Sequence, residues 1–267
     1  MSAAGEELEA LLALMRTLRD PDTGCAWDRQ QTFVSIAPFT IEEAYEVADA
    51  IGRGDLARLR DELGDLLFQV VFHARMAEEA GSFDFASVAR GIRDKLIRRH
   101  PHIFLERKAL DVSQLHVSWE TQKARERADA GMHGVLSDVP RALPALARAA
   151  KLGRRARRVG FDWTAAGEVR SKIDEELAEA DAAIAAAQHE QVAEEIGDLL
   201  FTIANWARHL EVDAEDALRR AALKFERRFE CMEQAAAGRG LALNELTAAQ
   251  WDELWHDAKS LTKGDKC

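Results

Sequence analysis

The sequence predicts an all-α protein built from two tandem repeats of one helical bundle. Apolar residues recur with the i, i+4, i+7 spacing of a single helix face at Leu59, Leu63, Leu66, Val70 and Ala74. No long alternating run of β-branched residues, which would indicate a strand, occurs in the 267 residues. An acidic frame that begins at Glu42 returns 133 positions later at Glu175, which indicates a duplication.

The first repeat predicts a pair of helices joined by a short turn. We expect one helix from about Ile41 to Ile51, a turn at "GRGD", and a longer helix from about Leu56 to Ala80 that stops at Gly81. Thr40 and Glu43 have the spacing of a capping box, so Glu43 has a structural explanation at the start of its helix. The second repeat should copy this helix pair.

The boundary between the repeats is predicted from helix-breaking residues. These residues gather between the halves at Gly131, Gly134, Pro140 and Pro144. We therefore expect two domains, residues 1–130 and 131–267. The duplication extends past the acidic frame, because "DKLIRRH" (94–100) matches "LKFERRF" (223–229) and "SWETQK" (118–123) matches "LWHDAK" (254–259).

The charge balance limits the possible partners. With 47 acidic and 36 basic residues the formal net charge is -11, which argues against a nucleic-acid partner because phosphate backbones need a basic face. A small polyphosphate that arrives with divalent cations stays possible. The N-terminus "MSAAGEELEALLALMRTLRD" lacks the basic start and apolar run of a signal peptide, and no stretch approaches the roughly 18 apolar residues of a spanning helix. We expect a soluble cytoplasmic protein with no membrane partner.

The helix that follows each acidic frame is apolar on more than one face. It reads "LLFQVVFHARMA" after Asp65 and "LLFTIANWARHL" after Asp198. Such a helix must be buried on several sides, which two helices of one small domain can hardly provide. We therefore expect a homodimer in which the helix pairs of two copies pack as four-helix bundles.

Paired carboxylates are the main candidate site. Two residues three positions apart lie on one face of a helix, and each repeat has such a pair on both predicted helices. The pairs are Glu43 with Glu46 and Glu62 with Asp65 in the first repeat, and Glu176 with Glu179 and Glu195 with Asp198 in the second. If the two helices pack antiparallel, four carboxylates converge in each repeat.

These acids have two interpretations. Charge on a helix is usually a solvated face paired with lysine or arginine. However, no basic residue lies four positions before or after Glu195 or Asp198, where a helical ion pair would need one. Gathered acids without such partners repel each other unless a cation joins them. Ligands that are all oxygen select a hard ion, Mg²⁺ or, as a substitute, Mn²⁺.

A glycine stands inside a predicted helix beside each acid cluster. Gly64 and Gly197 each cost up to about 1 kcal/mol in a helix interior relative to alanine. Close approach of a neighbouring helix would explain both glycines, and so would a packing notch unrelated to metal.

A magnesium cluster in a helical groove favours phosphoryl chemistry, and basic groups should then flank the acids. Lys172 lies one turn before Glu176, whereas the equivalent residue of the first repeat is Phe39. On a later helix, Lys224, Arg227 and Arg228 could hold a triphosphate, although such runs are more often solvated. Trp255 could stack on a base or pack in the core with Trp251.

The acidic signature E-E-x-x-E followed by E-x-x-D resembles that of the all-α nucleoside triphosphate pyrophosphohydrolases. With "GCAWDRQQT", "RRHPHIF", "VGFDW" and "KFERRF", the tandem arrangement resembles the two-domain MazG family across nearly the whole chain. The resemblance implies a dimeric, Mg²⁺-dependent enzyme that binds ATP and other NTPs or dNTPs. It implies cleavage between the α and β phosphates to NMP and pyrophosphate, in house-cleaning or nucleotide-pool control.

The resemblance also assigns residues, and it makes the second repeat the catalytic one. The implied metal ligands are Glu176, Glu179, Glu195 and Asp198, and the implied nucleotide contacts are Lys172, Gln191 to Glu194, Lys224 to Arg228, and Trp255. A metal-activated water would attack the α phosphorus, with Glu175 as the candidate general base. The first repeat keeps all four acids, Glu43, Glu46, Glu62 and Asp65, so its activity stays open.

Two other classes of protein compete with this interpretation. A di-iron carboxylate bundle should carry an inward-facing E-x-x-H motif twice, and only Glu253 to His256 has that spacing. A helical interaction module would carry the acids as surface charge. Converging carboxylates favour the enzyme, and splayed carboxylates favour the module.

Overall fold

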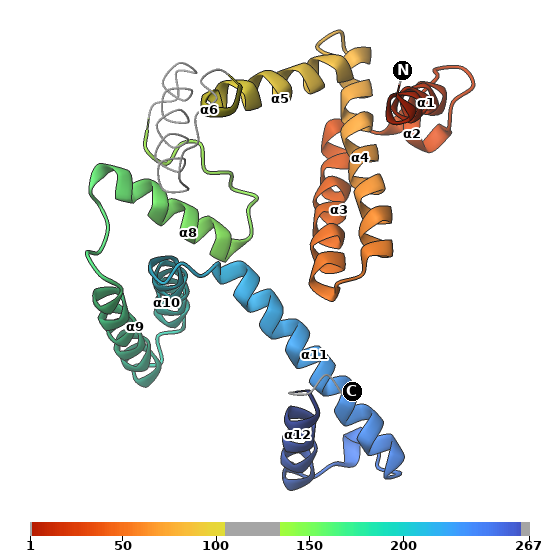
Figure 1. Cartoon of the computed structure of the whole chain (residues 1–267). Helices are drawn as coiled ribbons and strands as arrows, with labels where there is room; N and C mark the ends of the chain where they lie inside the picture. Colours follow the sequence, from red (N-terminus) through yellow and green to blue (C-terminus); the bar gives the residue numbers. More distant parts are fainter. Residues whose placement is uncertain (1, 105–133, 263–267) are drawn as a thin grey trace. The chain divides into compact units, whose positions relative to one another are not determined.

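A computed structural model describes residues 2–104 and 134–262, and all regular structure in these ranges is helical (Figure 1). The first stretch contains α1 (Ala3–Leu18), α2 (Ala26–Gln30), α3 (Phe33–Arg53), α4 (Leu56–Glu79), α5 (Phe85–Arg99) and α6 (Pro101–Phe104). The second contains α8 (Ala145–Ala156), η1 (Arg157–Val159), α9 (Ala166–Ala185), α10 (His189–His209), α11 (Ala214–Gly238), η2 (Leu243–Glu245) and α12 (Ala248–Thr262). The prediction of an all-α protein is confirmed.

The chain divides into two compact units, residues 1–126 and 127–267. The boundary predicted after residue 130 lies outside the described residues, and it stays a prediction. The same holds for "SWETQK" (118–123), the first-repeat copy of the tryptophan and lysine segment.

In each unit the acidic frame forms a helical hairpin. Gly54 ends α3 in the left-handed conformation at φ 70°, and the Asp55 side chain caps α4 by accepting hydrogen bonds from the backbone N–H groups of Ala57 and Arg58. The predicted helix from Leu56 to Ala80 therefore matches α4 to within one residue. In the second unit α9 and α10 pack together as α3 and α4 do (Figure 1). The predicted copy of the helix pair is confirmed.

Helix α3 begins eight residues before the predicted start at Ile41. Thr32 accepts a hydrogen bond from the Ser35 backbone N–H, and Ser35 Oγ accepts one from the Thr32 N–H, so this pair forms the capping box. Thr40 lies inside the helix, where its hydroxyl contacts the Ile36 carbonyl. The capping explanation for Glu43 is therefore wrong. Pro38 removes only one donor from the helix, and the cap upstream of it fixes the start.

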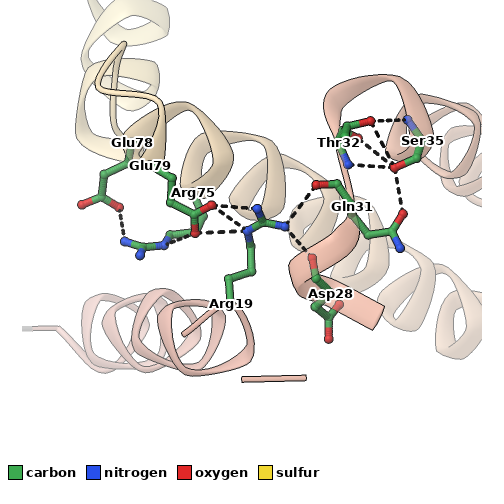
Figure 2. Close-up of polar contacts among 8 residues, drawn as sticks. All are labelled: Arg19, Asp28, Gln31, Thr32, Ser35, Arg75, Glu78 and Glu79. Atoms are coloured by element: carbon green, nitrogen blue, oxygen red, sulfur yellow. Dashed lines mark hydrogen bonds and ion pairs between the residues drawn. The ribbon is translucent and has the colours of Figure 1, made fainter. Parts of the chain in front are cut away.

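Unit 1 has a core between α1, α3 and α4, and a buried arginine links it to α2. The core residues are Met15, Ile36, Val71, Phe72 and Met76. Arg19 donates to both carboxylate oxygens of Glu79 and to the backbone carbonyls of Asp28 and Gln31 (Figure 2). Its guanidinium also lies 5.3 Å from the centre of the Phe72 ring. This network holds the segment "GCAWDRQQT" (24–32), which includes α2, against the hairpin.

In unit 2, α10 packs against α9 and also against α8. A Cβ atom on Gly153 would stand 1.9 Å from Asn205 Oδ1, so glycine is required where α8 meets α10. Asp162 follows α8 and accepts two hydrogen bonds from Arg208 at the end of α10. The distance from Arg208 Nη1 to Asp162 Oδ2 is 2.9 Å. A separate core that includes Met232 and Leu254 joins α11 to α12.

In the part of each unit that the structure describes, the interior glycines of the hairpins do not mark a close contact with another helix. Apart from the adjoining residues and backbone of its own helix, no described atom lies within 4 Å of a Cβ built on Gly64 or Gly197. Within the described residues of each unit, the expectation that close helix approach explains these glycines is therefore wrong. None of the described helices combines the length and the apolar character that a bilayer span requires.

Candidate functional site

The second repeat brings three of its predicted acids together. Glu176 and Glu179 come from α9 and Glu195 comes from α10, and one carboxylate oxygen of each lies within 4.8 Å of the others. Glu176 is buried, Glu195 is half-buried and Glu179 is exposed. The hairpin places acids from both helices at one point, so the carboxylates converge rather than splay.

One lysine neutralises part of this cluster. Lys172 Nζ lies 2.9 Å from Glu175 Oε1 and 3.1 Å from Glu176 Oε1, and these two hydrogen bonds raise the pKa of Lys172. Desolvation raises the pKa of Glu179, and the nearby carboxylate of Glu195 adds to the effect while Lys172 opposes it. The three clustered acids and Glu175 thus have one described cation beside them, Lys172, which leaves excess negative charge at the site.

The other predicted second-repeat residues lie outside this group of three. Asp198, Gln191 and Glu194 are exposed on α10, and Lys224 and Arg227 are exposed on α11. Asp198 is one turn beyond Glu195 on the same helix. Within residues 134–262 no hydrogen bond or ion pair joins these residues to Glu176, Glu179 or Glu195, so their part in a nucleotide site stays a prediction.

Trp255 is half-buried on α12 with two cations beside it. Arg228 Cζ lies 5.5 Å and Lys259 Nζ 5.3 Å from the centre of its ring, and Phe225 lies against it at 5.7 Å between ring centres. The ring therefore packs in the α11 and α12 core and also positions Arg228. Lys259 ends the repeated segment "LWHDAK" (254–259), and its place four residues after Trp255 is a helical contact distance.

The first repeat holds a similar cluster with a different cation. Oxygens of Glu43, Glu62 and Asp65 lie within 4.8 Å of one another. Desolvation and the Asp65 charge raise the pKa of Glu43. Glu46 is not one of these three, but the neighbouring carboxylate of Glu62 raises its pKa, and it also lies beside Arg58, whose Nη2 is 3.8 Å from its Oε1. Sequence reasoning missed Arg58, although its position four residues before Glu62 is the signal for a helical ion pair.

The fold and the two clusters define an all-α protein whose paired helical hairpins each gather carboxylates from both helices. The model of the MazG nucleotide pyrophosphohydrolase domain matches residues 31–104 and 167–232, one segment in each repeat and together more than half of the chain. The chain belongs to this family, as the sequence predicted.

Similar proteins span nearly the whole chain. A nucleoside triphosphate pyrophosphohydrolase of Escherichia coli strain K12 is 49% identical over 95% of this chain and 97% of its own length. A nucleoside triphosphate pyrophosphohydrolase/pyrophosphatase MazG of Thermotoga maritima is 42% identical over 97% of this chain and 98% of its own. A nucleoside triphosphate pyrophosphohydrolase of Mycobacterium tuberculosis is 32% identical over 98% of this chain and 73% of its own.

Proposed function

We propose that this protein is a nucleoside triphosphate pyrophosphohydrolase that converts an NTP or dNTP and water into the monophosphate and pyrophosphate. The observation that carries the proposal is the cluster of Glu176, Glu179 and Glu195 in a chain of the MazG family. Relatives that match over almost their full length bear the name of this activity.

The donor set suits a hard divalent cation. Three carboxylates with oxygens within 4.8 Å of one another offer oxygen ligands only, which favours Mg²⁺ or Mn²⁺. Glu176, Glu179 and Glu195 would hold the ion, and Asp198 would join them from the next turn of α10. A divalent ion held by these residues would supply charge neutralisation for the phosphates and a lower pKa for the attacking water.

The remaining residues have proposed roles in binding and proton transfer. Lys172 is partly exposed, so its ammonium can leave Glu175 for a phosphate oxygen of the substrate. Water forms a bond to the α phosphorus, and the bond from that phosphorus to the oxygen bridging to the β phosphate breaks. Pyrophosphate leaves, and the exposed carboxylate of Glu175 takes the proton from water. Lys224, Arg227 and Arg228 on α11 would hold the triphosphate.

A homodimer is part of the proposal. The hairpin helices expose apolar side chains in both repeats, at Leu63, Leu67 and Val70 on α4 and at Ile196, Leu200, Phe201 and Ile203 on α10. The open space at Gly64 and Gly197 leaves room on these helices for a close neighbour. A second copy would cover both surfaces and complete the four-helix bundles.

The identity of the products tests the activity. We expect purified protein with Mg²⁺ and ATP to release AMP and pyrophosphate in equal amounts, because water positioned at the α phosphorus gives both in one step. Chelation with EDTA should abolish the release, and added Mg²⁺ should restore it. ADP and orthophosphate as the main products would contradict the proposed reaction, and no turnover of any NTP or dNTP would favour an interaction module.

A further inference from the structure

The two repeats have the same four types of acid at matching positions, but a different cation lies beside each cluster. A shift of 133 positions relates the repeats, so Arg58 corresponds to Gln191 and Lys172 corresponds to Phe39. The cation of the first cluster therefore stands on the second helix of its hairpin, and the cation of the second cluster stands on the first helix.

Arg58 joins the two helices of its hairpin through their acids. Its Nε lies 2.9 Å from Glu62 Oε1 on α4. Its Nη2 and Nη1 each lie 3.8 Å from an acid on α3, the carboxylates of Glu46 and Asp49 respectively. Glu62 is buried, and a buried carboxylate needs a permanent partner. The guanidinium of arginine supplies one, because it stays charged at every physiological pH and its fork of donors can bridge several oxygens.

Lys172 makes a different arrangement in the second repeat. Both of its partners, Glu175 and Glu176, lie on its own helix, α9. Among the described ion pairs none includes Glu179 or Glu195, so no described cation links the acids of α9 to those of α10. The lysine also ends in a single flexible ammonium group, which can move to a phosphate without unmaking a bridge between helices.

We propose that Arg58 is the resident counter-ion of the first-repeat cluster and that it keeps divalent metal out of this site. A metal ion there would have to displace the guanidinium from Glu62 or bind a few ångströms from its positive charge, and both cost free energy. In the first repeat the arginine then occupies the place that the proposed metal ion takes in the second repeat, and the acids contribute to helix packing. The inference rests on the proposed function only in taking the second repeat as the metal site.

Metal binding without substrate tests the inference. In the full chain, Glu179→Gln with Glu195→Gln removes the second site, and free Mn²⁺ is measured by electron paramagnetic resonance. We expect weak Mn²⁺ binding in this background and at least tenfold tighter binding once Arg58→Gln is added. Arg60→Gln is the matched control, because Arg60 lies on the same helix and, among the described residues, forms its only ion pair with its exposed neighbour Asp61. Adding Glu62→Gln should remove the gain.

Two results would overturn the inference. One is Mn²⁺ binding after Arg58→Gln that equals binding after Arg60→Gln, with unchanged helicity in both variants. The other is tight Mn²⁺ binding in the background that still has Arg58 and that disappears with Glu62→Gln.

The reverse exchange is an independent test should Arg58→Gln fail to fold. Gln191→Arg places the arginine in the second repeat, and we expect at least tenfold weaker Mn²⁺ binding there. Gln234→Arg, at an exposed position on α11, adds the same charge away from the cluster and should bind Mn²⁺ as the unchanged chain does. Equal binding by these two variants would contradict the role of Arg58. A chain that binds Mn²⁺ but releases no pyrophosphate would contradict the proposed function and leave the inference about Arg58 standing.

Discussion

In each acid cluster the buried glutamate has a cation four residues before it. Lys172 precedes Glu176 on α9, and Arg58 precedes Glu62 on α4. Their counterparts in the other repeat, Glu43 and Glu195, have no such cation and are only half-buried. In each cluster the buried carboxylate is thus the one with a cation one turn before it, in agreement with the cost of burying an unpaired charge.

The variants Glu179→Gln and Glu46→Gln should differ in activity. Glutamine keeps the shape but removes a ligand charge, so we expect Glu179→Gln to cost on the order of a hundredfold or more in turnover. Glu46→Gln should cost little, because Glu46 lies beside Arg58 and outside the converging group of its own repeat. The measurement is Mg²⁺-dependent pyrophosphate release. Equal losses would mean two working sites, and a loss confined to Glu46→Gln would overturn the assignment to the second repeat.

At the scale of the elements, Asp162 ties the segment after α8 to the end of α10. The hydrogen bonds from Arg208 lower the pKa of Asp162 to about 2, with burial opposing them and His209 assisting. The His209 Nε2 atom lies 3.1 Å from Asp162 Oδ1. The segment "VGFDW" therefore has a structural role, since its aspartate holds two helices together at the entry to the second repeat.

Stability should depend on this carboxylate in acid. The pKa of Asp162 is 3.8 when unperturbed and about 2 in the fold. Its stabilisation is thus present above about pH 4 and is lost as the pH falls through 2, and it amounts to about 2 kcal/mol. Asp162→Asn should lower the free energy of unfolding, measured in urea, by about this amount at pH 7. Between pH 4 and 2 the free energy of unfolding of this variant should fall less than that of the unchanged chain.

A surface aspartate serves as the control for this measurement. Asp174→Asn removes an acid that pairs with Arg170 on α9 and is 61% exposed, so it should change stability by less than about 1 kcal/mol. If both variants unfold at the same urea concentration as the unchanged chain, the pairing of Asp162 is not stabilising.

For the whole molecule, the apolar side chains that remain exposed on α4 and α10 support the proposed homodimer. Light scattering at micromolar concentration should report about twice the 29.7 kDa of one chain. Leu200→Glu should shift the protein towards monomer, because it places a charge on the proposed interface. Leu14→Glu on α1 is matched in exposure, 50% against 49%, and should leave the mass unchanged. A monomer that still turns over NTPs would show that one copy is sufficient.

The sequence was sufficient for the helical hairpins, and three of the four acids predicted to converge in each repeat come together. The turn residues at 52–55 fix where α3 ends and α4 begins, and the three-residue spacing of Glu176 and Glu179 fixes the face they share. These features depend on residues close together in the chain, so local patterns contain them. The repeat then allowed the second hairpin to be predicted from the first.

The pairing of charges was decided by the tertiary structure. The sequence predicted convergence of four acids, but it did not predict that Arg58 joins Glu62 to acids on α3 or that Arg208 joins α10 to Asp162. It also placed the start of α3 at Ile41, since Thr40 and Glu43 fit a cap as well as Thr32 and Ser35 do. Local spacing determines which residues share a helix face. Burial and ion pairing depend on what another helix brings to that face, and only packing sets this.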